Sequence, residues 1–179
     1  FGFPLVPPAN APYHFTTSSS GIFQARIFDD TGHIQIAEPD LNGTPFGNLI
    51  TIAPPSAKIA GASYDFGRVV SVPNTPSGIQ IVQEFAGSTI TAQLTFTSDG
   101  VAHYEVTDWN GFAPSETNVT ASSDASEHSY GFGEKFNSLD QAGNKVHIMT
   151  NDQGGGKNDY SYKSSPWFIS TRGYGFHLD

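Results

Sequence analysis

The chain has 179 residues, no cysteine and a formal net charge of −9. A (β/α)₈ barrel needs about 250 residues, so a chain of this length has no room for one. Disulfides, thiolate metal sites and cysteine nucleophiles are excluded as well. Only 8 Lys and Arg accompany 17 Asp and Glu, without a basic cluster, which argues against binding to nucleic acid. No apolar stretch approaches the roughly 20 residues of a membrane span, so we expect no membrane segment.

The composition predicts a β protein. The 14 Phe, the 7 Tyr and frequent Thr, Val and Ile suit a pleated surface, and the 19 Gly and 12 Pro suit turns between short strands. Neither an internal repeat nor an amphipathic helix is evident. We therefore predict one all-β domain over residues 1–179, built as an antiparallel β-sandwich.

The first elements in chain order are a lead-in and a hairpin. Residues 1–15 are expected to form an extended lead-in, because four of the first twelve residues are proline. Gln24–Phe28 and Ile34–Ala37 are predicted strands, and the turn signal Asp29–Gly32 between them predicts a hairpin.

The clearest pattern lies between residues 79 and 107. Ile79–Phe85 is apolar, and Thr89–Phe96 alternates strictly between apolar and polar residues, as in a half-buried antiparallel strand. Ala102–Thr107 alternates again after the tight-turn signal Ser98–Gly100. We predict a β-meander, because alternation with period two would scatter the apolar side chains around a helix.

From Trp109 onward, the sequence predicts fewer regular elements. Trp109–Asp124, rich in Ser, Thr, Asn and Pro, is expected to be a loop, and Val146–Met149 and Trp167–Ile169 are predicted short strands.

Aromatic side chains in β proteins are more often buried than exposed, so Trp167 and Phe168 are assigned to the core. Tyr160 and Tyr162 stand in a polar stretch and are the better candidates for stacking on a sugar ring. Trp109, Trp167 and Tyr174 are weaker candidates for the same role.

The segment Tyr130–Glu134 admits two interpretations. Gly131 and Gly133 allow positive φ or a close backbone approach. Either the segment is a strand-end turn that anchors a loop, with Glu134 and Lys135 forming an ion pair or capping it, or Glu134 is a catalytic acid. The first is favoured, because a lone carboxylate lacks the partner that glycoside hydrolysis requires.

No metal or cofactor site is predicted. The six His are dispersed without metal-ligand spacing. Asp152, Asn158 and Asp159 carry oxygen ligands that suit calcium, but their spacing matches no EF-hand and favours a solvated loop. Two glycosylation sequons begin at Asn42 and Asn118, and with the sparse charge they favour a secreted protein.

Several short motifs follow one another in a fixed order over the last third of the chain. They are Tyr130–Glu134, Leu139-Asp140, the Thr150–Asp152 loop, Pro166–Ser170 and Gly173–Gly175. In this order they resemble the N-terminal, galactose-mutarotase-like β-sandwich of glycoside hydrolase family 31, the α-glucosidase and α-xylosidase family. The resemblance covers roughly Val101 to Asp179.

The resemblance implies a place within a larger enzyme. Family members hydrolyse or transfer α-linked sugars with retention, using two carboxylates of a downstream (β/α)₈ barrel that belongs to the same polypeptide or to a separate chain. This chain alone is therefore expected to be inactive and to supply no catalytic residue. The loop 150–160 is expected to reach the barrel active site, where Asp152 would bind a hydroxyl of an oligosaccharide in the −1 subsite.

Two other functions stay open. The chain could be a stand-alone, non-catalytic carbohydrate-binding β-sandwich, or a structural or adhesive secreted module. Asp152 could also be a residue that caps a turn before the glycines.

Overall fold

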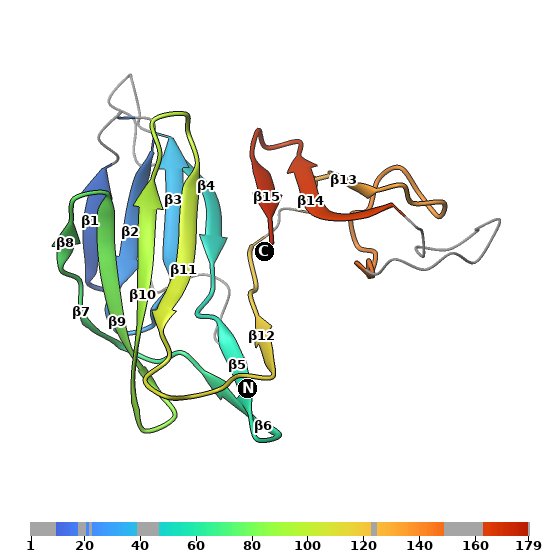
Figure 1. The fold of residues 1–179 in the computed structure, drawn as a ribbon. Helices are drawn as coiled ribbons and strands as arrows, with labels where there is room; N and C mark the ends of the chain where they lie inside the picture. The colour runs from blue at the N-terminus through green and yellow to red at the C-terminus, as the bar shows by residue number, and fades with distance from the viewer. Residues whose placement is uncertain are drawn as a thin grey trace. The chain divides into compact units, whose positions relative to one another are not determined.

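The computed structural model describes residues 10–17, 21, 23–38, 47–122, 125–148 and 163–178. Every regular element within these ranges is a β-strand (Figure 1), and the strands pair antiparallel, which confirms the predicted class. The chain divides into two compact units, Phe1–Ser122 and Ser123–Asp179, here called unit 1 and unit 2. The grouping of residues 1–179 into one domain stays a prediction.

Unit 1 holds the first twelve strands of the described residues. They are β1 Tyr13–Thr17, β2 Gln24–Phe28, β3 Ile34–Glu38, β4 Gly47–Ile52, β5 Ser56–Ile59, β6 Ala62–Asp65, β7 Val69–Ser71, β8 Asn74–Thr75, β9 Gly78–Phe85, β10 Ser88–Phe96, β11 Ala102–Asp108 and β12 Glu116–Asn118. One sheet has the order β1-β2-β3-β4, a second the order β11-β10-β9-β7 with β8 beside β9, and a third the order β12-β5-β6.

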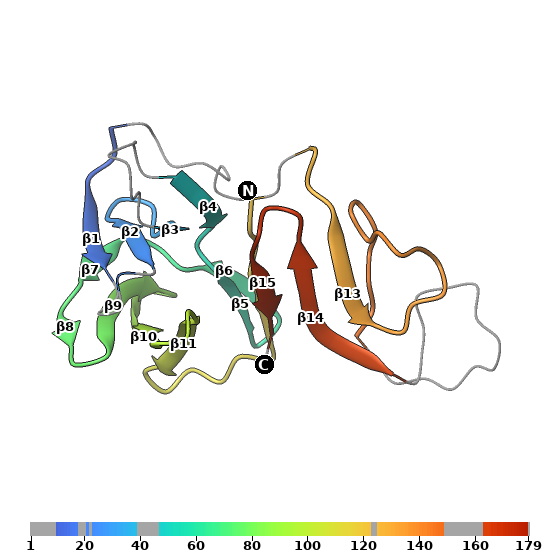
Figure 2. The same ribbon diagram turned by 90° about the horizontal axis from the view of Figure 1, so that it is seen from above.

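The first two sheets form a sandwich with an aliphatic core, and they lie in two layers when seen from above (Figure 2). Ile27 and Ile34 are buried on one sheet, and Ile81, Ile90 and Leu94 are buried on the other. Alternation places these residues on the inner faces, because successive side chains of a strand point to opposite sides. The predicted hairpin and meander are confirmed.

An aromatic cluster closes one end of this core. Phe66 and Phe85 are fully buried. Trp109 contacts both rings edge to face, with 5.8 Å between centroids in each case. Such edge-to-face pairs are favourable because the positive edge of one ring meets the negative face of the other. Trp109 is therefore partly buried against this cluster.

Two predicted boundaries in unit 1 are wrong. The lead-in predicted for residues 1–15 is too long, because β1 begins at Tyr13 and pairs with β2. Tyr13 packs its ring on Phe28 at 5.5 Å between centroids. The loop predicted for 109–124 contains β12, which pairs with β5.

Unit 2 contains one three-stranded sheet in the described residues, with the order β13-β14-β15. The strands are β13 Ser129–Gly133, β14 Ser164–Ser170 and β15 Gly175–His177. The strand predicted at Val146–Met149 is wrong over its described part, 146–148, which has no regular structure. The strand predicted at Trp167–Ile169 is confirmed and extends further at both ends.

Candidate functional site

The three predicted substrate contacts, Asp152, Tyr160 and Tyr162, lie outside the described residues. The same holds for the loop 150–160, for Asn158 and Asp159, and for Asn42. The described residues on either side of that segment, 125–148 and 163–178, belong to unit 2. The candidate site is therefore built from this unit.

A distorted stretch of β13 brings two backbones into close contact. Gly131, Phe132 and Gly133 all have positive φ, at 136°, 66° and 80°. A Cβ on Gly133 would lie 1.9 Å from the carbonyl oxygen of Lys163, and one on Gly131 would lie 2.7 Å from that of Trp167. The expected close approach at both glycines is present, and it explains why no larger residue fits there.

The residues after this stretch contact both segments that flank 149–162. Glu134 donates its N–H to Lys163 O at 3.0 Å, and its carboxylate pairs with Lys163 Nζ at 3.2 Å. Lys135 Nζ donates to His147 O at 2.8 Å and to Ser164 Oγ at 3.1 Å. This arrangement favours the loop-anchoring interpretation of Tyr130–Glu134. Glu134 pairs with Lys163, and Lys135 bonds to His147 and Ser164, so these contacts of the two neighbours are long-range rather than with each other.

The two faces of β14 differ in burial. Phe168 stacks between Phe132 and Phe176, at 5.1 Å and 5.7 Å between ring centroids. Trp167 and Ile169 are on the opposite face and are 45% and 44% exposed. The core assignment is thus wrong for Trp167, because neighbouring residues of a strand cannot both point to the same side.

A buried carboxylate joins the start of unit 2 to β14 and the turn after it. Glu127 is 5% exposed, and its Oε1 accepts a hydrogen bond from Ser170 Oγ and one of 2.5 Å from the hydroxyl of Tyr174. Burial raises the pKa of Tyr174 to about 12, and the hydrogen bond to Glu127 adds to the shift. Tyr174 is therefore an uncharged donor near neutral pH, and sequence reasoning missed Glu127 because no local pattern marks it.

Asp140, the carboxylate of the Leu139-Asp140 motif, organises the turn beside β13. Its Oδ1 accepts from the N–H groups of Ala142 and Ser129 at 3.0 and 3.2 Å, and its Oδ2 lies 2.6 Å from His128 Nδ1. The Ala142 N–H, followed by His128, lowers the pKa of Asp140. Asp140 therefore has a structural role, which is to hold this turn against Ser129 of β13 and His128.

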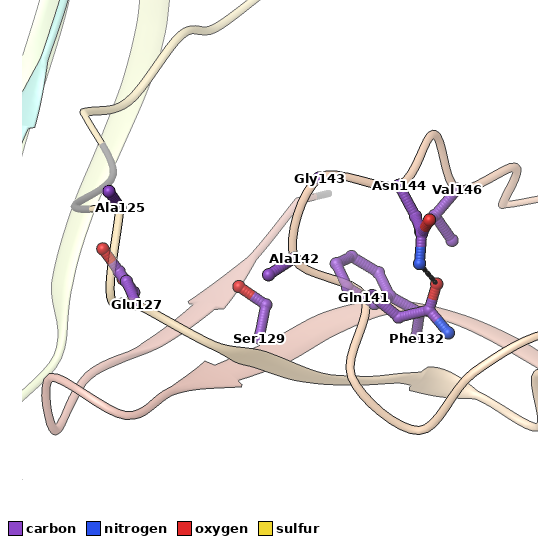
Figure 3. Close-up of a pocket in the computed structure, with 9 residues that line it drawn as sticks. All are labelled: Ala125, Glu127, Ser129, Phe132, Gln141, Ala142, Gly143, Asn144 and Val146. Carbon is purple, nitrogen blue, oxygen red and sulfur yellow. Dashed lines mark hydrogen bonds between the residues drawn. The ribbon is translucent and has the colours of Figure 1, made fainter.

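An open pocket of about 660 Å³ adjoins these groups (Figure 3). Its lining residues are Ala125, Glu127, Ser129, Phe132, Gln141, Ala142, Gly143, Asn144 and Val146. The polar side chains Glu127, Gln141 and Asn144 are hydrogen-bonded within the unit. Gln141 is 4% exposed and bonds to Asn137, Ser138 and Asn144, the last at 3.4 Å. A network satisfied in this way stiffens the unit and leaves few groups to recognise a ligand.

The three described carboxylates of unit 2, Glu127, Glu134 and Asp140, are each engaged in structural contacts. Within the described ranges, no three His, Cys, Asp or Glu side chains gather closely enough to hold a metal ion. None of the described segments forms a helix long and apolar enough to cross a membrane.

These features define an all-β, antiparallel domain of the β-sandwich type in a chain too short for a (β/α)₈ barrel. The family model of the glycosyl hydrolase 31 N-terminal galactose mutarotase-like domain matches residues 50–179, and the chain belongs to this family. Such N-terminal domains normally accompany a catalytic barrel. No curated protein matches the chain, and no solved structure does.

Proposed function

We propose that the chain is the N-terminal domain of a retaining α-glycosidase, an α-glucosidase-like hydrolase or transglycosylase that acts on α-linked oligosaccharides. The observation that carries the proposal is the family match over residues 50–179, which spans the ordered motifs from Tyr130 to Gly175. The catalytic nucleophile and the acid/base belong to a barrel, in the same polypeptide or in a separate chain. The domain alone is inactive, and the sequons and sparse charge support a secreted enzyme.

The domain contributes to the substrate site through the segment after Ile148. Asp152 binds a sugar hydroxyl in the −1 subsite, and Tyr160 and Tyr162 stack on sugar rings of the substrate. The contacts of Glu134 and Lys135 on both sides of this segment support that role, because binding residues on loops require a rigid scaffold.

The test compares the complete polypeptide with residues 1–179 alone on a panel of α-glucosides and α-xylosides. The complete polypeptide should hydrolyse at least one substrate, and the isolated chain should hydrolyse none. Asp152→Ala should lower kcat/KM by about 10²-fold, since a polar contact strengthened in the transition state is worth a few kcal/mol. Activity of the isolated chain, or an unchanged kcat/KM in the variant, would contradict the proposal.

Two further outcomes separate the alternatives. Saturable binding of a maltooligosaccharide by the isolated chain, with no activity in the complete polypeptide, would favour the stand-alone carbohydrate-binding module. A folded chain that neither binds sugar nor associates with a barrel would favour a structural module.

A further inference from the structure

Two aromatic side chains lie exposed on the first strand of unit 1. Tyr13 and Phe15 are 47% and 53% exposed. They are two positions apart on β1, so they point to the same side of the sheet, about 7 Å apart along the strand. Within the described residues, β1 is the outermost strand of its sheet (Figure 1). We call these two neighbouring rings the β1 platform, because a single exposed ring needs no explanation but an exposed pair does.

The strand register places polar side chains beside the platform. Phe15 lies opposite Arg26 of β2, and Arg26 lies opposite Gln35 of β3. Residues directly opposite one another share a face of the sheet, with about 5 Å between their Cβ atoms. Gln24 points to the same side as Arg26. Gln35 donates to Thr51 Oγ1 at 3.4 Å, and its amide has a second donor and an acceptor for further partners.

The ring of Tyr13 is held in place before any ligand binds. It packs against the ring of Phe28 at 5.5 Å between centroids, and Arg26 Cζ lies 5.0 Å from its centroid. Two contacts of this kind restrict the ring while about half of the side chain stays exposed. A ligand therefore meets an ordered surface, and less conformational entropy is lost on binding.

The charge of this face differs from that of the chain. The chain has 17 Asp and Glu against 8 Lys and Arg. The outward-facing positions of β1, β2 and β3 include no carboxylate; they are Tyr13, Phe15, Thr17, Gln24, Arg26, Phe28, Gln35 and Ala37. Aromatic rings next to amides suit a ligand that has both apolar faces and hydroxyls. A sugar has both, since its C–H faces stack on rings and its hydroxyls bond to amides.

The size of the platform favours a sugar over a protein. Two half-exposed rings offer roughly 200 Å² of apolar surface. A stable protein interface buries about 800 Å² on each partner, so the platform is too small for one. Two neighbouring rings of a sugar chain, in contrast, can each contact one aromatic side chain.

We propose that the β1 platform is an oligosaccharide-binding site, in which Tyr13 and Phe15 stack on sugar rings and Gln24 and Gln35 bond to hydroxyls. The choice of an α-linked oligosaccharide rests on the proposed function. The site consists of described residues of unit 1, so its binding does not depend on Asp152.

The test is a titration of residues 1–179 with maltoheptaose and with isomaltoheptaose, followed by NMR of the backbone amides. At least one of the two sugars should cause saturable shifts in β1, β2 and β3. Phe15→Thr, which keeps a residue that favours strands, should weaken binding by about tenfold, as the loss of an aromatic anchor does. Asp152→Ala should leave this affinity unchanged. Shifts confined to residues outside β1–β3, or no saturable shifts with either sugar, would overturn the inference.

Two variants control for general damage. Phe136→Thr removes a phenylalanine of unit 2 that is 48% exposed, and it should keep the wild-type affinity. Tyr13→Phe keeps the ring and should bind within about twofold of wild type, since stacking does not need the hydroxyl. Equal losses in Phe15→Thr and Phe136→Thr would contradict the proposal, as would a loss in Phe15→Thr that only follows unfolding of the chain.

Sedimentation separates the remaining occupant, a second copy of the chain. If the chain dimerises, Phe15→Thr abolishes the dimer and no sugar binds, the platform is an interface between copies and the inference is wrong. A complete polypeptide that is inactive while the platform still binds sugar would contradict only the proposed function.

Discussion

Replacing Gly133 by alanine should destabilise unit 2 by about 3 kcal/mol. An alanine at the observed φ of 80° costs about 1–2 kcal/mol, because its Cβ crowds the following carbonyl. The added Cβ would also lie 1.9 Å from Lys163 O, where real contacts stay beyond 3.0 Å. The backbone must move by about 1 Å to relieve this contact, and overpacking of this kind costs about 1–3 kcal/mol more.

The assay is urea unfolding followed by tryptophan fluorescence. The chain has two tryptophans, and Trp109→Phe leaves Trp167 as the sole reporter, located in unit 2. Gly173→Ala is the matched control, because Gly173 has a φ of 89° in the same unit and a Cβ added there would meet no atom within 4 Å. It should lose only the conformational part, about 1–2 kcal/mol. Equal losses in the two variants would refute the argument from close backbone contact.

Three further outcomes are expected. Wild-type stability should fall as pH rises from about 10 through about 12, because Tyr174 binds its proton more tightly in the folded state, and Tyr174→Phe should remove that part of the slope in pH-dependent unfolding. The same variant should lose about 1–3 kcal/mol at pH 7, since buried Glu127 loses a donor. Tyr104→Phe should leave the unfolding free energy unchanged or raise it slightly, because the buried hydroxyl of Tyr104 has no hydrogen-bond partner among the described residues. Asn118 is exposed on β12, so expression through a eukaryotic secretory pathway should give an intact-mass increase from which Asn118→Gln removes the mass of one glycan.

The parts of the fold that could be predicted are those with strong local patterns. Thr89–Phe96 alternates over eight residues, and its apolar members are on the buried side of β10. The hairpin of Gln24–Phe28 with Ile34–Ala37 has a turn signal at the right place. In both cases the period of the apolar residues and the turn chemistry agree, so no distant contact was needed to choose the structure.

The β5–β6 hairpin gave no comparable signal. In β5 only Ala57 is buried, with Ile59 packed beside it, and all four residues of β6 are exposed, so these four-residue strands are too short for a periodicity to show. At 146–148 the opposite happened, because a strand was predicted and none is present. Apolar residues there suggested a strand, but the carbonyl of His147 accepts from a side chain instead of from a ladder. Short apolar runs do not specify which partner their backbone will find.

In the candidate site, too, the sequence indicated which contacts a segment can make but not its distant partners. The sequence indicated that the glycines around Phe132 allow a close approach and that the segment anchors a loop. It could not indicate that Lys163 is the residue approached, or that Lys135 bridges to His147 and Ser164, because those partners are 12 to 29 positions away. Local residue types state which contacts a segment can make, and the β13–β14 register decides which of them it does make. A register shift of one residue would turn Phe168 away from Phe132 and bring Trp167 into its place. The glycine contacts of β13 thus fix both the packing of the sheet and the position of the charged groups that follow it.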